Sequence, residues 1–190
     1  MINNNFPLKT LLEYEQYFFT ENVLIQLTNI FQYENKIICL CTPAVADAFY
    51  RLKKKEVLCL DIDNRFNYLP KFINIDINNI NYENNNNNNI NFLIPDEYKN
   101  PDLIIVDPPF FKLNLNYLYK FIDFLTNKNK KTKIIFAFII RNEKELLKVF
   151  KDYNLKLTKF KLEYNNVNNT KWENYGIYSN FQQGKIKFIK

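Results

Sequence analysis

The sequence predicts a single α/β domain with a mostly parallel sheet, helices on both faces and an antiparallel pair of strands at its C-terminal edge. Three observations predict this fold. Short apolar runs alternate with segments that carry a helical apolar stripe, as in β-α-β units. The runs are apolar throughout, which is typical of strands buried on both faces. Finally, 190 residues of which 47% are hydrophobic suffice for one domain, residues 1–190, with a full core.

The N-terminal part of the chain predicts a helix, a strand and a second helix. Residues 1–10 form a loose lead-in, and the hydroxyl of Thr20 suits a helix N-cap. The first buried strand spans 36–41, and a helix over 44–52 begins after it at Thr42-Pro43, since proline is well placed in a first helical turn. The free N–H groups of that helix would lie at the carboxyl end of the strand. The apolar stripe that follows Thr20 consists of Val23, Leu24, Leu27, Ile30 and Phe31.

Three further strands each end in carboxylates. In open α/β sheets, ligands bind at the carboxyl ends of the strands. An acid that ends the second strand can accept hydrogen bonds from both hydroxyls of a ribose, and a solvated turn acid is the alternative. The acid after the third strand could face an adenine amino group or a loop. The strands and acids are 56–62 with Asp61 and Asp63, 71–75 with Asp76, and 102–106 with Asp107.

The C-terminal half continues the alternation and ends in two strands of a different kind. Residues 155–164 and 175–181 alternate in polarity, which indicates an antiparallel pair at the sheet edge. A polar loop with Trp172 joins them, and we expect the basic tail over 182–190 to be frayed. The other elements are helices over 115–126 and 143–150 and a strand over 133–140.

Residues 78–91 form an asparagine-rich insert, with six consecutive asparagines at 84–89. Such low complexity predicts a disordered loop tip without a catalytic role. We expect that shortening residues 83–91 leaves stability and turnover nearly unchanged, because long surface loops tolerate changes in length.

Missing residue types exclude several kinds of site. The chain has no histidine, which excludes Ser-His-Asp and Cys-His catalysis and histidine metal sites. Cys39, Cys41 and Cys59 lie in apolar runs, where cysteine packs as a small hydrophobe, and we expect no metal. Only two glycines are present, so the chain contains neither a phosphate-cradling glycine loop nor a G-x-G-x-x-G motif.

The net charge of +6 and the pI of about 9.0 suit a nucleic acid or an acidic protein partner, or reflect a lysine- and asparagine-rich composition. The N-terminus lacks the basic segment and apolar run of a signal peptide. No stretch approaches the 18 apolar residues of a membrane span. We therefore expect a monomer in the cytoplasm or nucleus, without membrane contact.

The motif Asp107-Pro108-Pro109-Phe110 ends the strand over 102–106. Because prolines cannot donate ladder hydrogen bonds, the strand must stop here. The Asp107 carboxylate and a proline carbonyl of fixed direction could accept two hydrogen bonds from an amino group. Phe110 offers a π-face for a flat base or a cation. The alternative is an ordinary strand-ending turn.

These motifs together resemble the class I, Rossmann-like N-methyltransferases of the Asp-Pro-Pro-aromatic type, which use S-adenosylmethionine. The resemblance covers about residues 14–181, and three motifs follow in the family's order. It implies that Asp107, Pro108, Pro109 and Phe110 hold the target amine, and that Asp61 binds the ribose. The other residues that we expect at the cofactor are Phe18, Phe19 and Thr20 of Gln16–Thr20, Cys41, Thr42 and Pro43 after the first strand, and Asp76.

The pattern is most similar to one subgroup, which contains lysine methyltransferases of translation elongation factor 1-alpha and zinc-knuckle ribosomal-RNA adenine methyltransferases. This subgroup was long labelled a probable N6-adenine methyltransferase family. The zinc modules of its RNA enzymes are absent from this chain, which favours a lysine of an elongation factor as the acceptor. The alternatives are an N6-adenine in RNA or DNA, and an inactive binding module that retains the cofactor fold. The basic charge favours the RNA reading.

Overall fold

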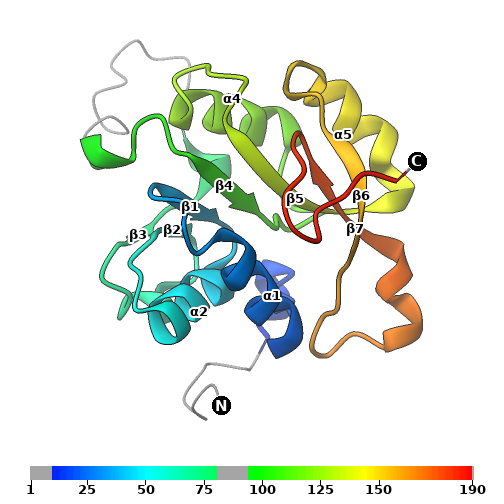
Figure 1. Ribbon diagram of the computed structural model, residues 1–190, viewed down its shortest axis with the longest axis horizontal. Helices are drawn as coiled ribbons and strands as arrows, with labels where there is room; N and C mark the ends of the chain where they lie inside the picture. The colour runs from blue at the N-terminus through cyan, green and yellow to red at the C-terminus, as the bar shows by residue number, and fades with distance from the viewer. Residues whose placement is uncertain (1–9, 81–93, 190) are drawn as a thin grey trace.

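The computed structural model describes residues 10–80 and 94–189, which form a sheet of seven strands in the order β3-β2-β1-β4-β5-β7-β6. The first five strands are parallel, and β7 is antiparallel to both of its neighbours. The predicted fold class is therefore confirmed (Figure 1). The strands are β1 (Ile37–Leu40), β2 (Leu58–Asp61), β3 (Phe72–Asn74), β4 (Leu103–Val106), β5 (Lys133–Ile139), β6 (Lys156–Lys161) and β7 (Tyr175–Ser179).

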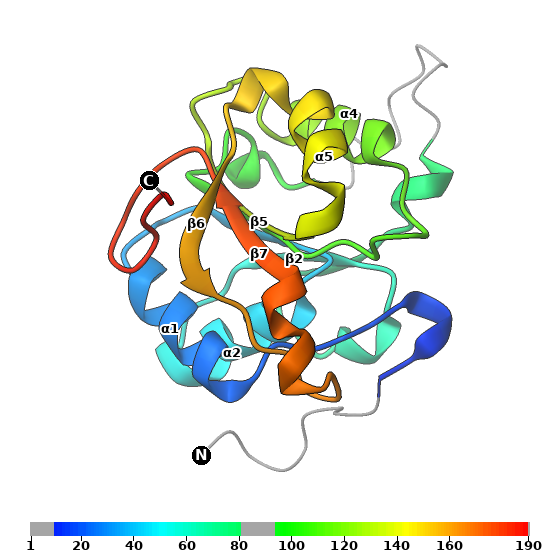
Figure 2. The ribbon, with the colours of Figure 1, turned by 90° about the vertical axis from the view of Figure 1, so that its right-hand side faces the viewer.

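Helices cover both faces of the sheet, as expected. Two of them, α1 and α2, lie on one face, and α4 and α5 lie on the other (Figure 2). These helices are α1 (Glu21–Phe31), α2 (Pro43–Lys53), α4 (Leu115–Leu125) and α5 (Glu143–Val149). The short 3₁₀ turns are Leu12–Tyr14, Asn64–Phe66, Ile77–Asn79, Asp96–Tyr98, Ile140–Asn142, Lys151–Tyr153 and Asn169–Asn174.

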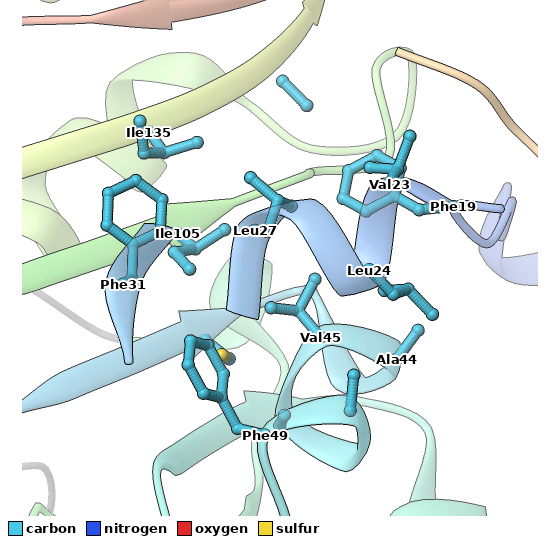
Figure 3. Packing of buried hydrophobic residues seen from close by; sticks show 14 of the residues in the cluster. Phe19, Val23, Leu24, Leu27, Phe31, Ala44, Val45, Phe49, Ile105 and Ile135 are labelled. Atoms are coloured by element: carbon cyan, nitrogen blue, oxygen red, sulfur yellow. The ribbon is translucent and has the colours of Figure 1, made fainter. Parts of the chain in front are cut away.

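The first helix shows how sequence signals become packing. Thr20 caps α1 by accepting a hydrogen bond of 3.4 Å from the backbone N–H of Val23, as predicted. The apolar stripe of α1, which includes Leu27 and Phe31, packs among side chains of α2 and the central strands (Figure 3). Burial of one such side chain stabilises the fold by roughly 1.5–3 kcal/mol, so this stripe fixes α1 on the sheet.

The strands are apolar throughout because each of their faces meets a separate core. In β1, Ile37 and Cys39 belong to the cluster under α1 and α2. Ile38 and Leu40 belong to the cluster under α4 and α5. This alternation follows from the two-residue period of a strand. Because helices cover both faces of the sheet, a ligand can approach it at the ends of the strands.

The C-terminal tail differs from its expected frayed state. Ile186 is fully buried, and the backbone N–H of Lys159 in β6 donates a hydrogen bond of 2.7 Å to the carbonyl of Lys187. The apolar side chain of Ile186 anchors the tail, although basic residues surround it in the sequence. Residues 1–9 and 81–93, which include most of the lead-in and the asparagine run at 84–89, lie outside the described residues. Within the described residues, no helix combines the length and apolar character that crossing a membrane requires.

Candidate active site

A cavity of about 290 Å³ opens at the carboxyl edge of the sheet. It lies where the strand order reverses, between β1 and β4, which is the usual ligand position in an open α/β sheet. The segments that follow β1, β2, β3 and β4 line it, together with residues 13–19 and Tyr164. Nearly all predicted site residues are thereby brought together.

Asp61, the last residue of β2, has a buried carboxylate at the cavity wall and is 6% exposed. Its Oδ1 accepts a hydrogen bond of 2.7 Å from the backbone N–H of Asp63. Burial raises the pKa of Asp61 to about 7, although this hydrogen bond acts in the opposite direction. Hydroxyl donors from a ligand would favour the charged form further, so Asp61 suits the ribose of a nucleoside cofactor.

Asp63 has a different, structural task. Arg65 donates hydrogen bonds from Nε and Nη2 to its carboxylate, and Gln16 donates from Nε2 at 2.8 Å. Burial alone would raise the pKa of Asp63, but these donors hold it below its ordinary value. Arg65 also donates to the Gln16 side-chain oxygen at 2.7 Å. This network fastens the segment around Gln16 to the end of β2, which the sequence did not indicate.

The turn after β1 is built without glycine. Cys41 adopts a left-handed conformation, with φ of 54°, directly after the last residue of β1 rather than within the strand as predicted. The Thr42 hydroxyl donates a hydrogen bond of 3.2 Å to the carbonyl of Ile105 in β4, and Pro43 begins α2. Burial, together with the nearby carboxylates of the cavity, raises the pKa of the Cys41 thiol well above its ordinary value. The thiol therefore presents a neutral surface to the cavity.

Four aromatic residues of the segment before α1 line the cavity: Tyr14, Tyr17 and the two predicted ones, Phe18 and Phe19. Phe18 and Phe19 line it and are each 3% exposed, so they also belong to the core beneath α1. Thr20 is not among the lining residues. Its hydroxyl caps α1 and donates a hydrogen bond of 3.0 Å to Glu163.

Asp76 lines the cavity beyond β3. Its expected place near an adenine amino group stays a prediction. Its two carboxylate oxygens accept hydrogen bonds from the backbone N–H of Asn78 at 3.0 Å and from the side chain of Asn79 at 2.7 Å. These bonds cap the turn Ile77–Asn79 and hold Asp76 in place.

Asp107 follows β4 and lines the cavity. Its Oδ1 accepts a hydrogen bond of 3.0 Å from the hydroxyl of Tyr164. The pKa of Asp107 is raised well above its ordinary value by burial. The hydrogen bond from Tyr164 acts in the opposite direction but does not offset the effect of burial. The Pro109 carbonyl accepts a hydrogen bond of 3.2 Å from Leu113. No hydrogen bond found among the described residues uses the Pro108 carbonyl, which remains a second acceptor beside Asp107.

Aromatic rings support Phe110 from two sides. Its ring lies 5.6 Å from the ring of Phe138, edge to face, and 5.6 Å from the ring of Tyr175. Tyr175 in turn contacts Tyr164, with ring centroids 5.0 Å apart. The half-buried Phe110 ring is thus held rigidly at the wall of the cavity, next to the two acceptors of the motif.

Residues 13–17, which we call the N-terminal strap, line the cavity and are bonded to two loops. Gln16 is bonded to Asp63, as described above. Directly before it, Glu15 accepts a hydrogen bond of 3.0 Å from the backbone N–H of Phe111, and Lys112 donates to the carbonyl of Glu13. The strap therefore connects the loop after β2 with the loop after β4.

The arrangement provides two adjoining places for ligands. The first, around Asp61, suits a nucleoside; the second, around Asp107 and the Pro108 carbonyl, suits a group that donates two N–H hydrogen bonds. Within residues 10–80 and 94–189, no group of three or more cysteine, aspartate or glutamate residues is placed to hold a metal ion.

Comparison with known proteins identifies one family. The model of the family described as "Probable N6-adenine methyltransferase" matches residues 12–183. Among curated proteins, none matches this chain significantly in sequence.

Solved structures share the fold. A putative RNA methyltransferase, PH1948 from Pyrococcus horikoshii, is 16% identical, with a TM-score of 0.50 over 94% of this chain and 90% of that chain. A SAM-dependent methyltransferase from Archaeoglobus fulgidus is 12% identical, with a TM-score of 0.48 over 83% and 91% of the two chains. The E. cuniculi Mtq2-Trm112 complex, which methylates the termination factor eRF1, matches at 15% identity, with a TM-score of 0.43 over 83% and 90%.

Proposed function

The chain belongs to the probable N6-adenine methyltransferase family and is an S-adenosylmethionine-dependent methyltransferase, and on that premise we propose that it methylates an amino nitrogen held by Asp107. Our proposed acceptor is a lysine of a translation elongation factor. The observation that carries the proposal is that Asp107, Pro108 and Phe110 line the same cavity, where no hydrogen bond found among the described residues uses the Pro108 carbonyl.

The residues of the first half of the cavity fit the cofactor. When bound, S-adenosylmethionine supplies a methyl group on a positively charged sulfur. Asp61 would accept hydrogen bonds from the ribose, with Phe18, Phe19 and Asp76 around the nucleoside. The turn over residues 41–43 would lie beside it, since the N-terminus of α2 begins there.

The residues of the second half would orient the acceptor. Asp107 and the Pro108 carbonyl would each accept one N–H, which directs the nitrogen lone pair toward the methyl carbon. The nitrogen would gain the methyl group, and the sulfur would keep the electrons of the bond it loses. A lysine amine that has lost its ammonium proton beforehand would leave as a charged methylammonium, whereas an adenine amino group would release a proton to water after transfer. The chain need not form a covalent intermediate, because orientation alone supplies several kcal/mol.

The charge of the cavity favours lysine as the acceptor. Beside Asp107, its acceptor half is lined by Glu13 and Glu15, and Lys112 is the cation among the lining residues there. Carboxylates and aromatic faces attract an ammonium group and repel the phosphates of a nucleic acid. A free lysine has a pKa near 10.4, so the bound amine must also lose a proton before transfer. The choice of an elongation factor rests on the sequence resemblance.

A specific contact favours adenine in RNA as the second candidate. The Arg141 guanidinium lies 5.4 Å from the centre of the Phe111 ring, and Phe111, directly after the motif, is 63% exposed. An exposed aromatic ring beside a cation suits a nucleobase and its phosphate. In that case Phe110 would stack on the adenine that leaves the strand.

Methyl transfer from tritium-labelled cofactor to purified elongation factor 1-alpha and to ribosomal RNA tests the proposal. We expect label in the protein that survives nuclease and is lost with protease, and none with the Asp107→Ala variant. Label that only nuclease removes would overturn lysine in favour of adenine. Cofactor binding without transfer to any acceptor would overturn both in favour of an inactive binding module.

A further inference from the structure

Tyr164 is a buried residue at the candidate site to which the sequence assigned no role. It follows β6, is 2% exposed, and reaches across to β4, where its hydroxyl donates a hydrogen bond of 3.0 Å to Oδ1 of Asp107. The two residues are 57 positions apart in the chain. Such a contact joins the C-terminal edge of the sheet to the centre of the motif.

The backbone around Tyr164 is fixed on both sides by the segment before α1. Asn165 donates a hydrogen bond of 2.8 Å to the carbonyl of Phe18, and the backbone N–H of Thr20 donates one of 2.9 Å to the carbonyl of Glu163. The Trp172 indole donates to the Tyr164 carbonyl at 3.1 Å. Tyr164 therefore cannot move relative to the segment before α1 unless these backbone hydrogen bonds break.

The ring of Tyr164 is held as firmly as its backbone. Its centroid lies 5.1 Å from that of Phe19 and 5.0 Å from that of Tyr175. With backbone and ring both fixed, the hydroxyl has one position, and that position determines which way the Asp107 carboxylate faces.

We propose that Tyr164 is a positioning residue that occupies Oδ1 of Asp107, so that Oδ2 is presented to the acceptor nitrogen. This inference rests on the proposed function of Asp107. Without the Tyr164 hydroxyl, no hydrogen bond found among the described residues would hold the Asp107 carboxylate, and its rotation would misdirect the acceptor lone pair. A tyrosine hydroxyl suits the task because it donates one hydrogen bond and remains uncharged. The same hydrogen bond favours the ionised form of the carboxylate.

Tyr164→Phe removes the hydroxyl and keeps the ring, and Tyr153→Phe provides a matched control. Tyr153 is 1% exposed and donates a hydrogen bond of 2.8 Å to Asp123. It precedes β6, whereas Tyr164 follows that strand, so the two tyrosine–aspartate pairs lie at opposite ends of it. The control thus loses the same kind of bond away from the cavity.

The experiment measures Asp107 directly and then the reaction. Carboxyl ¹³C NMR of the full chain without cofactor, with Asp107 assigned by Asp107→Asn, gives its titration midpoint. We expect a higher midpoint in Tyr164→Phe and an unchanged one in Tyr153→Phe. In single-turnover transfer we expect Tyr164→Phe to lower the rate about tenfold, the loss of one charged hydrogen bond, and to move the acid limb of the pH profile upward. The calorimetric Kd for S-adenosylmethionine should stay within twofold.

An unchanged Asp107 midpoint together with an unchanged rate in Tyr164→Phe would overturn the inference. An equal loss of rate in Tyr153→Phe would also overturn it, because the effect would then be one of general packing. If the midpoint shifts but wild type methylates no acceptor, the proposed function is overturned, while the hold of Tyr164 on Asp107 is confirmed.

Discussion

The backbone N–H of Asp63 donates a hydrogen bond of 2.7 Å to Oδ1 of Asp61. Two acids that are two residues apart thereby meet opposite environments. Burial raises the pKa of Asp61 to about 7, whereas Arg65 and Gln16 overcome the effect of burial and lower that of Asp63. Asp63 is satisfied by the protein itself, and Asp61 is left to a ligand.

The first prediction is that Asp61→Ala weakens binding of S-adenosylmethionine by about 10- to 100-fold, since hydrogen bonds to a charged group are worth roughly 1.5–3 kcal/mol. Titration calorimetry measures the Kd. Asp102→Ala is a matched control, because Asp102 also accepts backbone hydrogen bonds, from Asn35 and Lys36. It precedes β4, at the amino ends of the strands, whereas the cavity lies at their carboxyl ends. Equal affinities of Asp61→Ala and wild type would remove Asp61 from the cofactor site.

The second prediction concerns the pH dependence of stability without cofactor. Because the folded pKa of Asp61, about 7, lies above the ordinary value, the folded chain keeps a proton that the unfolded chain releases. The stabilisation is complete below the ordinary pKa of an aspartate and is lost as the pH rises through about 7. Asp61→Asn should therefore raise the free energy of unfolding more at pH 8 than at pH 5, as measured by urea denaturation.

No histidine titrates in that interval, since the chain has none. The comparison with wild type cancels the contribution of Asp107, whose pKa is also raised by burial. A constant difference between wild type and Asp61→Asn from pH 5 to pH 8 would contradict the raised pKa.

The third prediction separates cofactor binding from methyl transfer. Asp107→Ala should abolish transfer and leave the Kd of the cofactor within a few-fold, because we propose that Asp107 holds the acceptor and not the cofactor. Asp107→Asn keeps an acceptor oxygen without the charge. We expect it to retain appreciable transfer to adenine, but to lose more with lysine, whose cation the charge attracts. Single-turnover assays on elongation factor and on RNA measure both, and full activity of Asp107→Ala on every acceptor would exclude the motif from the reaction.

The fourth prediction is that Phe110→Ala raises the KM for the acceptor and lowers kcat together. If the ring contacts the acceptor before and during transfer, as we propose, its loss affects both the ground state and the transition state. Steady-state kinetics separate the two constants. Phe124→Ala is a control for loss of an aromatic ring, because Phe124 lies on α4 away from the cavity lining. A change in neither constant would show that the acceptor does not touch Phe110.

The fifth prediction concerns the N-terminal strap. Glu15→Ala removes the acceptor for the Phe111 N–H and should raise the acceptor KM, while the cofactor Kd changes little. Gln16→Ala removes the hydrogen bond to Asp63 and should weaken cofactor binding instead. We expect changes of about 2- to 10-fold, the loss of one hydrogen bond each. Steady-state kinetics and calorimetry on both variants measure these changes. Identical effects of the two substitutions would show that Glu15 and Gln16 do not serve acceptor binding and cofactor binding separately.

Much of the fold could be predicted because its signals are local. Apolar runs marked the strands, and Asp61 and Asp107 stood at the ends of two of them, which parallel pairing brings to one edge. The contact of Tyr164 with Asp107 could not be predicted, since it depends on where β6 lies after a crossover of the chain. The strap was missed for the same reason: the bonds of Glu15 and Gln16 join distant segments and leave no periodic pattern. The packed tail was missed because one residue, Ile186, anchors it.

The position of Cys41 in the lining of the cavity bears on inhibitor design. A cysteine in a ligand pocket is a common target for inhibitors with an electrophilic group that bonds covalently to sulfur. Only the thiolate form of the side chain reacts rapidly with such a group. Burial and the surrounding carboxylates keep the Cys41 thiol protonated, so such warheads would react slowly here. Its side chain also occupies space that a glycine would leave empty at this left-handed position. Reversible compounds shaped around that sulfur are therefore the better route to selectivity over methyltransferases that carry a glycine loop.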